Sequence, residues 1–363
     1  MNYNELLDKI IEKQRKNVKK IGVKFPYNDV DGEFQIVPDY AWTNGFYPGL
    51  LWLAYLASRE EIFKTTAISL EERLDGVINS FTMAGHDVGF IWLLSSGINY
   101  KQNKNEDSRT RLLNMATYLA GRFNIAGNYI RAWDGDLEIR PKQAIIDCMM
   151  NLPLLFWASR ELKDPRFSHI AKAHAETVIK HFIDEDGAVR HICCFNPETG
   201  EFIESMGGQG YSNTSAWSRG ASWAIYGFAM MYRYTKCEKY LEVSKKVAKF
   251  FIENIKEDYV PAWDFRAPNN DVKDSSAGAI AASGLLEIFA HTNDIYYKEE
   301  AEKIISALAQ TCMTDENREA VLDKATAHLP VNENVEVGLI YADYYFMEAV
   351  YKLATDEYSL PWE

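Results

Sequence analysis

Two kinds of helical segment alternate along the whole chain, and this alternation constrains the fold more than any other feature. Segments with apolar residues on one face only are expected at 4–19, 60–81, 107–123, 167–182, 240–255 and 295–310. Each precedes a segment that is apolar on nearly every side, at 42–56, 86–98, 141–160, 217–234, 276–290 and 337–353. A helix that is apolar all round belongs in the interior of a large protein, whereas a one-faced helix covers its outside.

The two kinds of segment form about six outer–inner pairs that repeat every 50 to 60 residues or so, in pattern rather than in residue identity. An open solenoid would alternate similarly, but its inner helices would be less uniformly apolar. We therefore predict an all-α fold, an (α/α)6 barrel, as a single domain over 1–363, because no linker divides the chain. The long loops at 22–41, 124–143, 183–216 and 256–275 enter inner helices, so one face of the barrel should carry the binding site.

Charge and cysteine content narrow the partners and the compartment. The net charge of −13 argues against nucleic acid and against an anionic membrane surface, but not against a small anionic substrate. Five cysteines, two of them adjacent at 193 and 194, do not indicate a disulfide framework. The N-terminus, MNYNELLDKIIEKQRKN, has no apolar signal-peptide core. We expect a reduced, cytoplasmic protein without a membrane partner, and the sequence leaves the oligomeric state open.

Motifs for metals and nucleotides are missing from the sequence. The seven histidines include no HExxH, the Cys193–Cys194 pair lacks the spacing of a zinc site, and no GxGxxG or phosphate-binding loop follows a strand. We expect neither a metal nor an organic cofactor.

Two aspartates are the candidate catalytic groups. Asp147 lies in the apolar stretch PKQAIIDCMMNLPLLFWASR, where a carboxylate is costly to bury without a partner or a task. Asp87 lies near the start of another inner helix, so both side chains should reach the same mouth of the barrel if the inner helices run in the same direction. Two carboxyl groups in different environments can separate an acid from a base. The alternative for each is a helix-capping aspartate.

Aromatic and amide side chains near the same mouth are typical of a sugar-binding cleft. Nine Trp and 21 Tyr are many for this length, and five of the tryptophans, at 42, 133, 217, 223 and 263, fall in long loops or at helix starts. They could stack on sugar rings or could simply pack in the core. Gln209 and Arg219 offer hydrogen-bond donors. Arg219 calls for an anion, either the carboxylate of a ligand held bidentately or an aspartate in a structural ion pair.

Several long motifs, in order, resemble the unsaturated glucuronyl hydrolases of glycoside hydrolase family 88. They are WTNGFYPGLLWLAY at 42–55, HDVGFIWLLS at 86–95, IIDCMMNLPLLFWA at 145–158, FNPETG at 195–200, GGQGYSNTSAWSRGASWAIYGFA at 207–229, WDF at 263–265, KDSSAGAIAASGLLE at 273–287 and ADYYFMEA at 342–349. The resemblance covers nearly the whole chain and implies an (α/α)6 barrel.

The resemblance also implies an uncommon reaction that needs no cofactor. These enzymes hydrate the C4=C5 double bond of a 4,5-unsaturated uronic acid at the non-reducing end of lyase-generated oligosaccharides. Asp147 matches the family's general acid/base, and Asp87 matches a second carboxylate that binds ring hydroxyls and tunes Asp147. The substrate contacts implied or expected here are Trp42, His86, Trp133, His191, Gln209, Trp217, Arg219 and Trp223. An acid that acts near pH 6 agrees with an aspartate whose pKa burial raises.

The sequence departs from the family pattern in one region, and three alternative functions remain open. Residues 325–351 contain no Lys or Arg, only His328, where some relatives are expected to carry a sulfate pocket, so unsulfated chondroitin or hyaluronan products are favoured. The alternatives are the unsaturated rhamnogalacturonyl hydrolases, which share the fold and the chemistry, a non-catalytic sugar-binding barrel, and an (α/α)6 lyase or epimerase with His191 as base.

Overall fold

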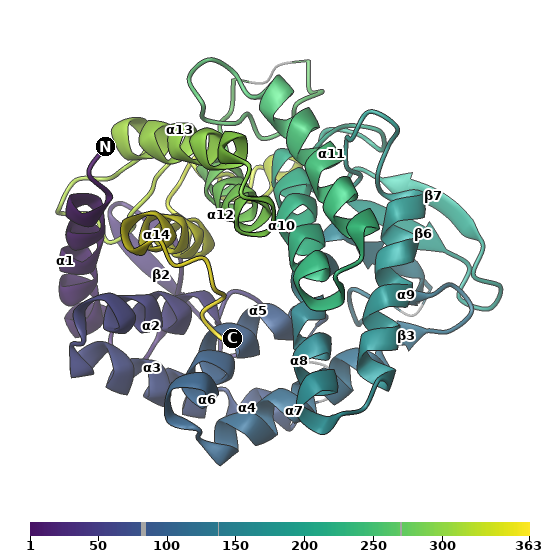
Figure 1. The fold of residues 1–363 in the computed structure, drawn as a ribbon, viewed down its shortest axis with the longest axis horizontal. Coiled ribbons are helices and arrows are strands. Elements are labelled where there is room, and N and C mark those ends of the chain that lie inside the picture. The colour runs from purple at the N-terminus through teal and green to yellow at the C-terminus, as the bar shows by residue number, and fades with distance from the viewer. Residues whose placement is uncertain (81–84, 137, 269–270) are drawn as a thin grey trace.

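Two concentric rings of helices make up the fold, as Figure 1 shows down the shortest axis of the molecule. The computed structural model describes residues 1–80, 85–136, 138–268 and 271–363. Each outer helix is followed in the chain by its inner partner, and the inner helices contact one another in a closed circuit. The prediction of an (α/α)6 barrel is confirmed.

The outer helices bury one face each. They are α1 (Tyr3–Ile21), α3 (Glu61–Arg73) with the short α4 (Asp75–Ile78), α7 (Glu106–Gly121), α9 (Arg166–His181), α11 (Glu238–Asn254) and α13 (Ile295–Thr311). In α11 the buried positions recur at helical spacing, for example Leu241, Ser244, Val247 and Phe251. Residue 81, at the end of the helix expected over 60–81, lies outside the described residues.

The inner helices are buried almost throughout. They are α2 (Phe46–Ser58), α5 (Val88–Trp92) continued by a π-helical turn, η1 (Leu93–Gly97), and by α6 (Ile98–Asn103), then α8 (Leu152–Leu162), α10 (Ser218–Thr235), α12 (Ser275–Thr292) and α14 (Ile340–Thr355). In α10 every residue from Ser218 to Met231 is buried. Although these helices are apolar, none of the helices in the described ranges is long and apolar enough to cross a membrane.

The connections that enter the inner helices carry three small antiparallel sheets. The sheets consist of β1 (Phe25–Val30) with β2 (Glu33–Val37), β3 (Phe123–Asn124) with β4 (Tyr129–Ile130), and β5 (Gln143–Ile145), β6 (Ile192–Phe195) and β7 (Phe202–Met206) in that order. Residue 137 of the loop 124–143 and residues 269–270 of the loop 256–275 lie outside the described ranges. All three sheets precede inner helices, so they surround the end of the barrel at which those helices begin.

The prediction of one continuous helix over 141–160 is wrong. This segment begins with a 3-10 turn, η2 (Arg140–Lys142), and strand β5, continues as a second 3-10 turn, η3 (Ile146–Met150), and becomes α-helical only in α8. The reason is a long-range pairing, because β5 lies in register with β6, Ile145 opposite Ile192, and the N–H of Ile146 donates to the carbonyl of His191. Asp147 therefore lies in a tight turn before a helix rather than inside one.

The inner helices approach so closely that Gly45 has no room for a side chain. Gly45 immediately precedes α2, and a Cβ atom there would overlap the carbonyl oxygen of Phe90 in α5. We expect Gly45→Ala to lower the free energy of unfolding by about 2 kcal/mol or more, because backbone must move to relieve the overlap. Urea denaturation measures this. Gly76→Ala is the matched control, since a Cβ at Gly76 meets nothing within 4 Å. Equal stability of both variants would contradict the tight crossing of α2 and α5.

Candidate active site

Asp87 and Asp147 lie at the starts of two neighbouring inner helices. Asp87 immediately precedes α5, and Asp147 lies in η3 just before α8. Asn151 joins the two helix starts, because its amide oxygen accepts from the N–H of Phe90 (2.9 Å) and its amide nitrogen donates to the backbone carbonyl of Asp147 (3.3 Å). The structure thus brings the two aspartates to the same mouth, close enough for the charge of Asp87 to act on Asp147.

Both carboxyl groups are largely removed from water. Asp147 is 8% exposed, and the side chain of Asp87 is 14% exposed. Burial raises the pKa of Asp147 to about 6, and the charge of Asp87 adds to the rise. Burial also raises the pKa of Asp87 to about 7, although the Asn151 amide and the Arg122 guanidinium oppose the change. Carboxyl groups with pKa values near neutrality can both give and take a proton at physiological pH.

One histidine faces each aspartate. The Nε2 atom of His86 lies 3.3 Å from Oδ1 of Asp87, and the Nε2 atom of His191 lies 3.7 Å from Oδ2 of Asp147. These two nitrogens and Asp147 Oδ2 are buried without a hydrogen-bond partner in the described chain. Buried polar atoms are nearly always paired, so three unpaired atoms gathered at two carboxyl groups indicate a place for a polar ligand or water.

Arg219 is held in a structural ion pair, the second of the two roles open to it. Its Nη1 lies 2.7 Å from Oδ2 of the buried Asp274 and also donates to the carbonyl of Thr326. Its Nη2 donates to the carbonyl of Ala327 (2.7 Å) and to Oε1 of Gln209. Because Arg219 holds the amide oxygen of Gln209, the amide nitrogen of Gln209 is left as the donor for a ligand.

The tryptophans expected to line the site divide into two groups. Trp42 and Trp133 are only partly buried. Trp42 packs against Phe46, Phe90 and Tyr341, and Trp133 carries the Arg140 guanidinium over its ring at 4.9 Å. The other three are packed in the interior, with Trp217 beneath His191 (ring centroids 4.3 Å apart), Trp223 against Phe90 and Tyr345, and Trp263 4% exposed. Of the five tryptophans, Trp42 and Trp133 are thus the two that are partly exposed to solvent.

Some residues that shape the site were not identified from the sequence. Asn151, Asp274 and Tyr341 are buried or nearly so and contact the residues above. The available signal was weak, since Asn151 stands four positions after Asp147, and Asp274 is a helix-capping residue that accepts from the N–H of Ser276. Nothing local indicates that Asp274 also binds Arg219, 55 positions away.

Comparison with known proteins agrees with this geometry. The model of Glycosyl Hydrolase Family 88 matches residues 14–359. The chain belongs to that family. It is 32% identical to the unsaturated chondroitin disaccharide hydrolase of Streptococcus pneumoniae, covering 99% of this chain and 93% of the relative. The family membership expected from the motifs is confirmed.

Solved structures of family 88 hydrolases share the fold. The unsaturated glucuronyl hydrolase of Bacillus sp. GL1, described as responsible for the degradation of glycosaminoglycan, superposes with a TM-score of 0.91 at 31% identity, over 97% of this chain and 96% of that one. A mutant unsaturated glucuronyl hydrolase from Streptococcus agalactiae, complexed with dGlcA-GalNAc6S, gives a TM-score of 0.87 at 25% identity, over 99% and 93% of the two chains.

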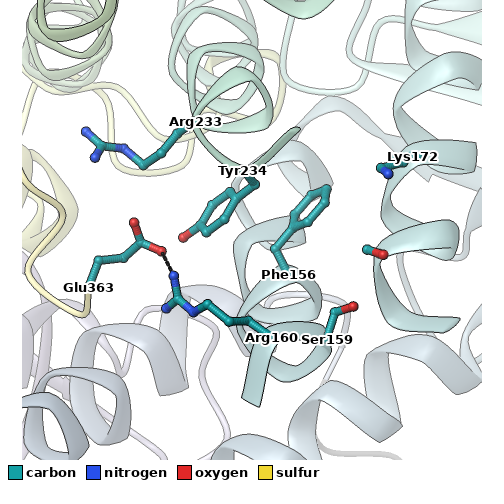
Figure 2. A pocket seen from close by; sticks show the side chains of 8 residues that line it. Phe156, Ser159, Arg160, Lys172, Arg233, Tyr234 and Glu363 are labelled. Atoms are coloured by element: carbon teal, nitrogen blue, oxygen red, sulfur yellow. Dashed lines mark hydrogen bonds and ion pairs between the residues drawn. The ribbon is translucent and has the colours of Figure 1, made fainter. Parts of the chain in front are cut away.

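A polar pocket of this hydrolase opens at the other end of the barrel. It has a volume of about 390 Å³ and lies at the last turns of α8 and α10, where Figure 2 shows Phe156, Arg160, Arg233 and Tyr234. Its arginines are already paired, Arg160 with Glu363 (3.0 Å) and Arg233 with Glu287 (2.5 Å). About 23 Å of helix separates this pocket from Arg219 at the start of α10, so it is not part of the aspartate site.

The raised pKa of Asp147 makes the stability of the hydrolase depend on pH. Relative to the ordinary value of 3.8, a folded-state pKa of about 6 gives stability that is complete below about pH 4 and lost as the pH rises through 6. Asp147→Asn cannot ionise, so at pH 8 it should unfold with a free energy about 3 kcal/mol higher than wild type, with almost no difference at pH 4. Urea denaturation at both pH values measures this. Asp31→Asn, in an exposed turn, should show no such difference, and a wild type as stable as Asp147→Asn at pH 8 would contradict the buried carboxyl.

Proposed function

We propose that this family 88 hydrolase releases 4,5-unsaturated glucuronic acid from the non-reducing end of lyase-generated glycosaminoglycan oligosaccharides of the chondroitin or hyaluronan type. The observation that carries the proposal is the pair of buried carboxyl groups, Asp87 and Asp147, with raised pKa values at the mouth of the barrel. The relatives named for unsaturated glucuronyl and chondroitin disaccharide substrates supply the substrate class.

The reaction is a hydration rather than an attack on the anomeric carbon. Asp147 donates its proton to C4, the double bond's electrons form the new C4–H bond, and positive charge develops at C5 next to the ring oxygen. A water molecule adds its oxygen to C5 and returns a proton to the Asp147 carboxylate. The product is a hemiketal at C5, which opens spontaneously and releases the remaining sugar from C1. Asp147 thus ends the cycle protonated, as it began.

Asp147 suits this task because of its surroundings. Protonation of a vinyl ether carbon needs an acid that still holds its proton near pH 6, and burial gives Asp147 a pKa of about 6. Its Oδ2 atom has no partner in the described chain, so it is available to the substrate. Asp87 lies beside it and is suited to bind ring hydroxyls, since a carboxyl oxygen accepts their hydrogen bonds.

The substrate carboxylate and sugar rings have matching groups around the aspartates. The amide nitrogen of Gln209, set in place by Arg219, is a donor for the uronate or for the attacking water. Trp42 and Trp133 are partly exposed and could contact the sugar rings. His86 and His191 lie within 4 Å of the aspartates, while the buried Trp217 and Trp223 support this arrangement from beneath.

We propose unsulfated substrates. Residues 325–351 carry no Lys or Arg, and His328 in this segment lies with Nε2 3.2 Å from the carbonyl of Gly208. Without a Lys or Arg side chain in this segment, an anionic sulfate group there would find no cation of the segment to pair with.

Ultraviolet absorbance tests the proposal, because the conjugated C4=C5 carboxylate absorbs and hydration destroys the chromophore. We expect the absorbance of unsaturated unsulfated chondroitin or hyaluronan disaccharides to fall with wild type. Asp147→Asn should lose at least about a thousandfold in kcat, as expected for removal of a general acid, while it still binds substrate. Asp31→Asn should retain the wild-type rate.

Two outcomes would contradict the proposal. Hydration of unsaturated rhamnogalacturonan disaccharides in place of the glycosaminoglycan products would assign the chain to pectin-derived substrates. Binding of the unsaturated disaccharides with no change in absorbance would make the barrel a sugar-binding protein. Faster turnover of sulfated than of unsulfated disaccharides would overturn the substrate preference alone.

A further inference from the structure

Each of the two histidines beside the aspartates has one ring nitrogen hydrogen-bonded to the backbone. This nitrogen is a donor in His86 and an acceptor in His191. In His86, Nδ1 lies 2.9 Å from the carbonyl oxygen of Ala132, which can only accept, so this nitrogen carries a proton. In His191, Nδ1 lies 2.8 Å from the N–H of Gln209, which can only donate, so this nitrogen carries a lone pair.

Both rings are neutral, so the second nitrogen of each is determined as well. Burial lowers the pKa of His86 to about 4 and that of His191 to about 3, and the charge of Arg219 adds to the effect on His191. In a neutral imidazole one nitrogen is a donor and the other an acceptor. The Nε2 atom of His86 is therefore an acceptor beside Asp87, and the Nε2–H of His191 is a donor beside Asp147.

The packing prevents either ring from exchanging its nitrogens. A Cβ atom at Gly208, whose φ is +56°, would overlap Nδ1 of His191, so only glycine lets the loop approach this face of the ring. Trp217 supports the ring with centroids 4.3 Å apart. His86 is fully buried, and its own N–H donates to the same carbonyl of Ala132 that binds its ring.

The two arginines that act on His86, His191 and the aspartates form their ion pairs with other carboxylates. Arg122 acts on Asp87 and His86 but lies 2.6 Å from Asp134. Arg219 acts on Asp147 and His191 but is paired with Asp274. The remaining groups that face the site are the Asn151 amide at Asp87, the buried thiol of Cys148 at Asp87 and Asp147, the phenol of Tyr341 at Asp147, and His328 and the backbone of Gly207 at His191. His86 also acts on Asp147. None of these groups forms an ion pair with either aspartate, and among the histidines His86 is 3.3 Å from Asp87 and His191 is 3.7 Å from Asp147.

We propose that His86 and His191 are positioning residues whose opposite, fixed tautomers give the two aspartates different roles. The acceptor nitrogen of His86 stabilises the protonated form of Asp87. The donor N–H of His191 stabilises the carboxylate that Asp147 becomes after it protonates C4. Asp87 then holds its proton when Asp147 is ionised, so the negative charge that develops on Asp147 faces the N–H of His191, whose Nε2 lies 3.7 Å from Oδ2, rather than a like charge.

The inference rests on the proposed function for its catalytic meaning, but the tautomers can be measured without any substrate. Long-range ¹H–¹⁵N NMR spectra of the ¹⁵N-histidine-labelled protein distinguish the two neutral tautomers and the imidazolium. With seven histidines in the chain, loss of a signal in His86→Gln or His191→Gln assigns each ring. We expect His86 protonated on Nδ1 and His191 on Nε2, both neutral throughout the pH range of activity. A shared tautomer, or an imidazolium at either position, would overturn the proposal.

Two variants of His191 separate its hydrogen bond to the N–H of Gln209 from the donor that it presents to Asp147. His191→Gln retains an amide donor near the position of Nε2, whereas His191→Asn retains an acceptor for the N–H of Gln209 but cannot reach Asp147. Loss of the donor destabilises the Asp147 carboxylate and raises its pKa. His191→Asn should therefore shift the basic limb of the kcat profile upward by about one pH unit and lower kcat about tenfold, with little change in KM. His191→Gln should keep that limb near the wild-type position.

The outcomes distinguish this inference from the proposed function. An inactive protein with the expected tautomers would refute the hydration reaction and leave the tautomer assignment standing. An active protein in which His191→Asn and His191→Gln share the wild-type pH profile would refute the positioning role. If a variant does not fold, the same NMR spectra show it, and that variant reports on stability only. The tautomers measured in wild type would then still test the proposal.

Discussion

Two carboxyl groups are buried side by side, and no cation among the described residues is paired to either. The rest of the structure depends on this constraint. An ion pair would lower the pKa of Asp87 or Asp147 and remove a usable acid. The two nearest guanidinium groups are instead paired with other aspartates, Arg122 with Asp134 at 2.6 Å and Arg219 with Asp274 at 2.7 Å. Their remaining hydrogen bonds go largely to backbone carbonyls. Because both arginines are already paired, neither forms an ion pair that would lower the pKa of Asp87 or Asp147.

The barrel itself could be predicted because it depends on a periodic pattern repeated along the chain. A helix such as α10, in which 14 consecutive residues of 18 are buried, can only lie in the interior, whatever its detailed neighbours. The prediction of a continuous helix over 141–160 was wrong because this segment does not depend on a local pattern. Its conformation depends on the pairing of β5 with β6, some fifty residues later, and an apolar run such as QAIIDCMM is compatible with a strand or a helix until its partner is known.

The site was predictable only where a residue conflicts with its local surroundings. Asp147 in an apolar run and Asp87 before a glycine at a helix start both stood out, and the structure brings them together. Asn151, Asp274 and the roles of His86 and His191 did not stand out, because each depends on a contact between distant positions, such as His86 with Ala132 across 46 residues. The tryptophans show the same limit, since exposure of Trp42 and burial of Trp223 follow from packing that their neighbours in sequence do not reveal.

The two ends of the barrel treat buried charge differently, and the difference explains why one end can perform chemistry. At the C-terminal ends of the inner helices, buried glutamates have charged or polar partners: Glu287 is bound by Arg233, and Glu348 by Lys352 at 2.6 Å and by the hydroxyl of Tyr226. Arg233 and His291 hold the pKa of Glu287 at about 2 despite its complete burial. At the other end the same burial acts on Asp87 and Asp147 without such partners, and their pKa values rise toward neutrality. A carboxylate in an ion pair stabilises the fold but holds no proton that it could donate. A buried carboxyl group without an ion pair, next to a histidine of fixed tautomer, destabilises the fold at neutral pH. It holds a proton that it can transfer.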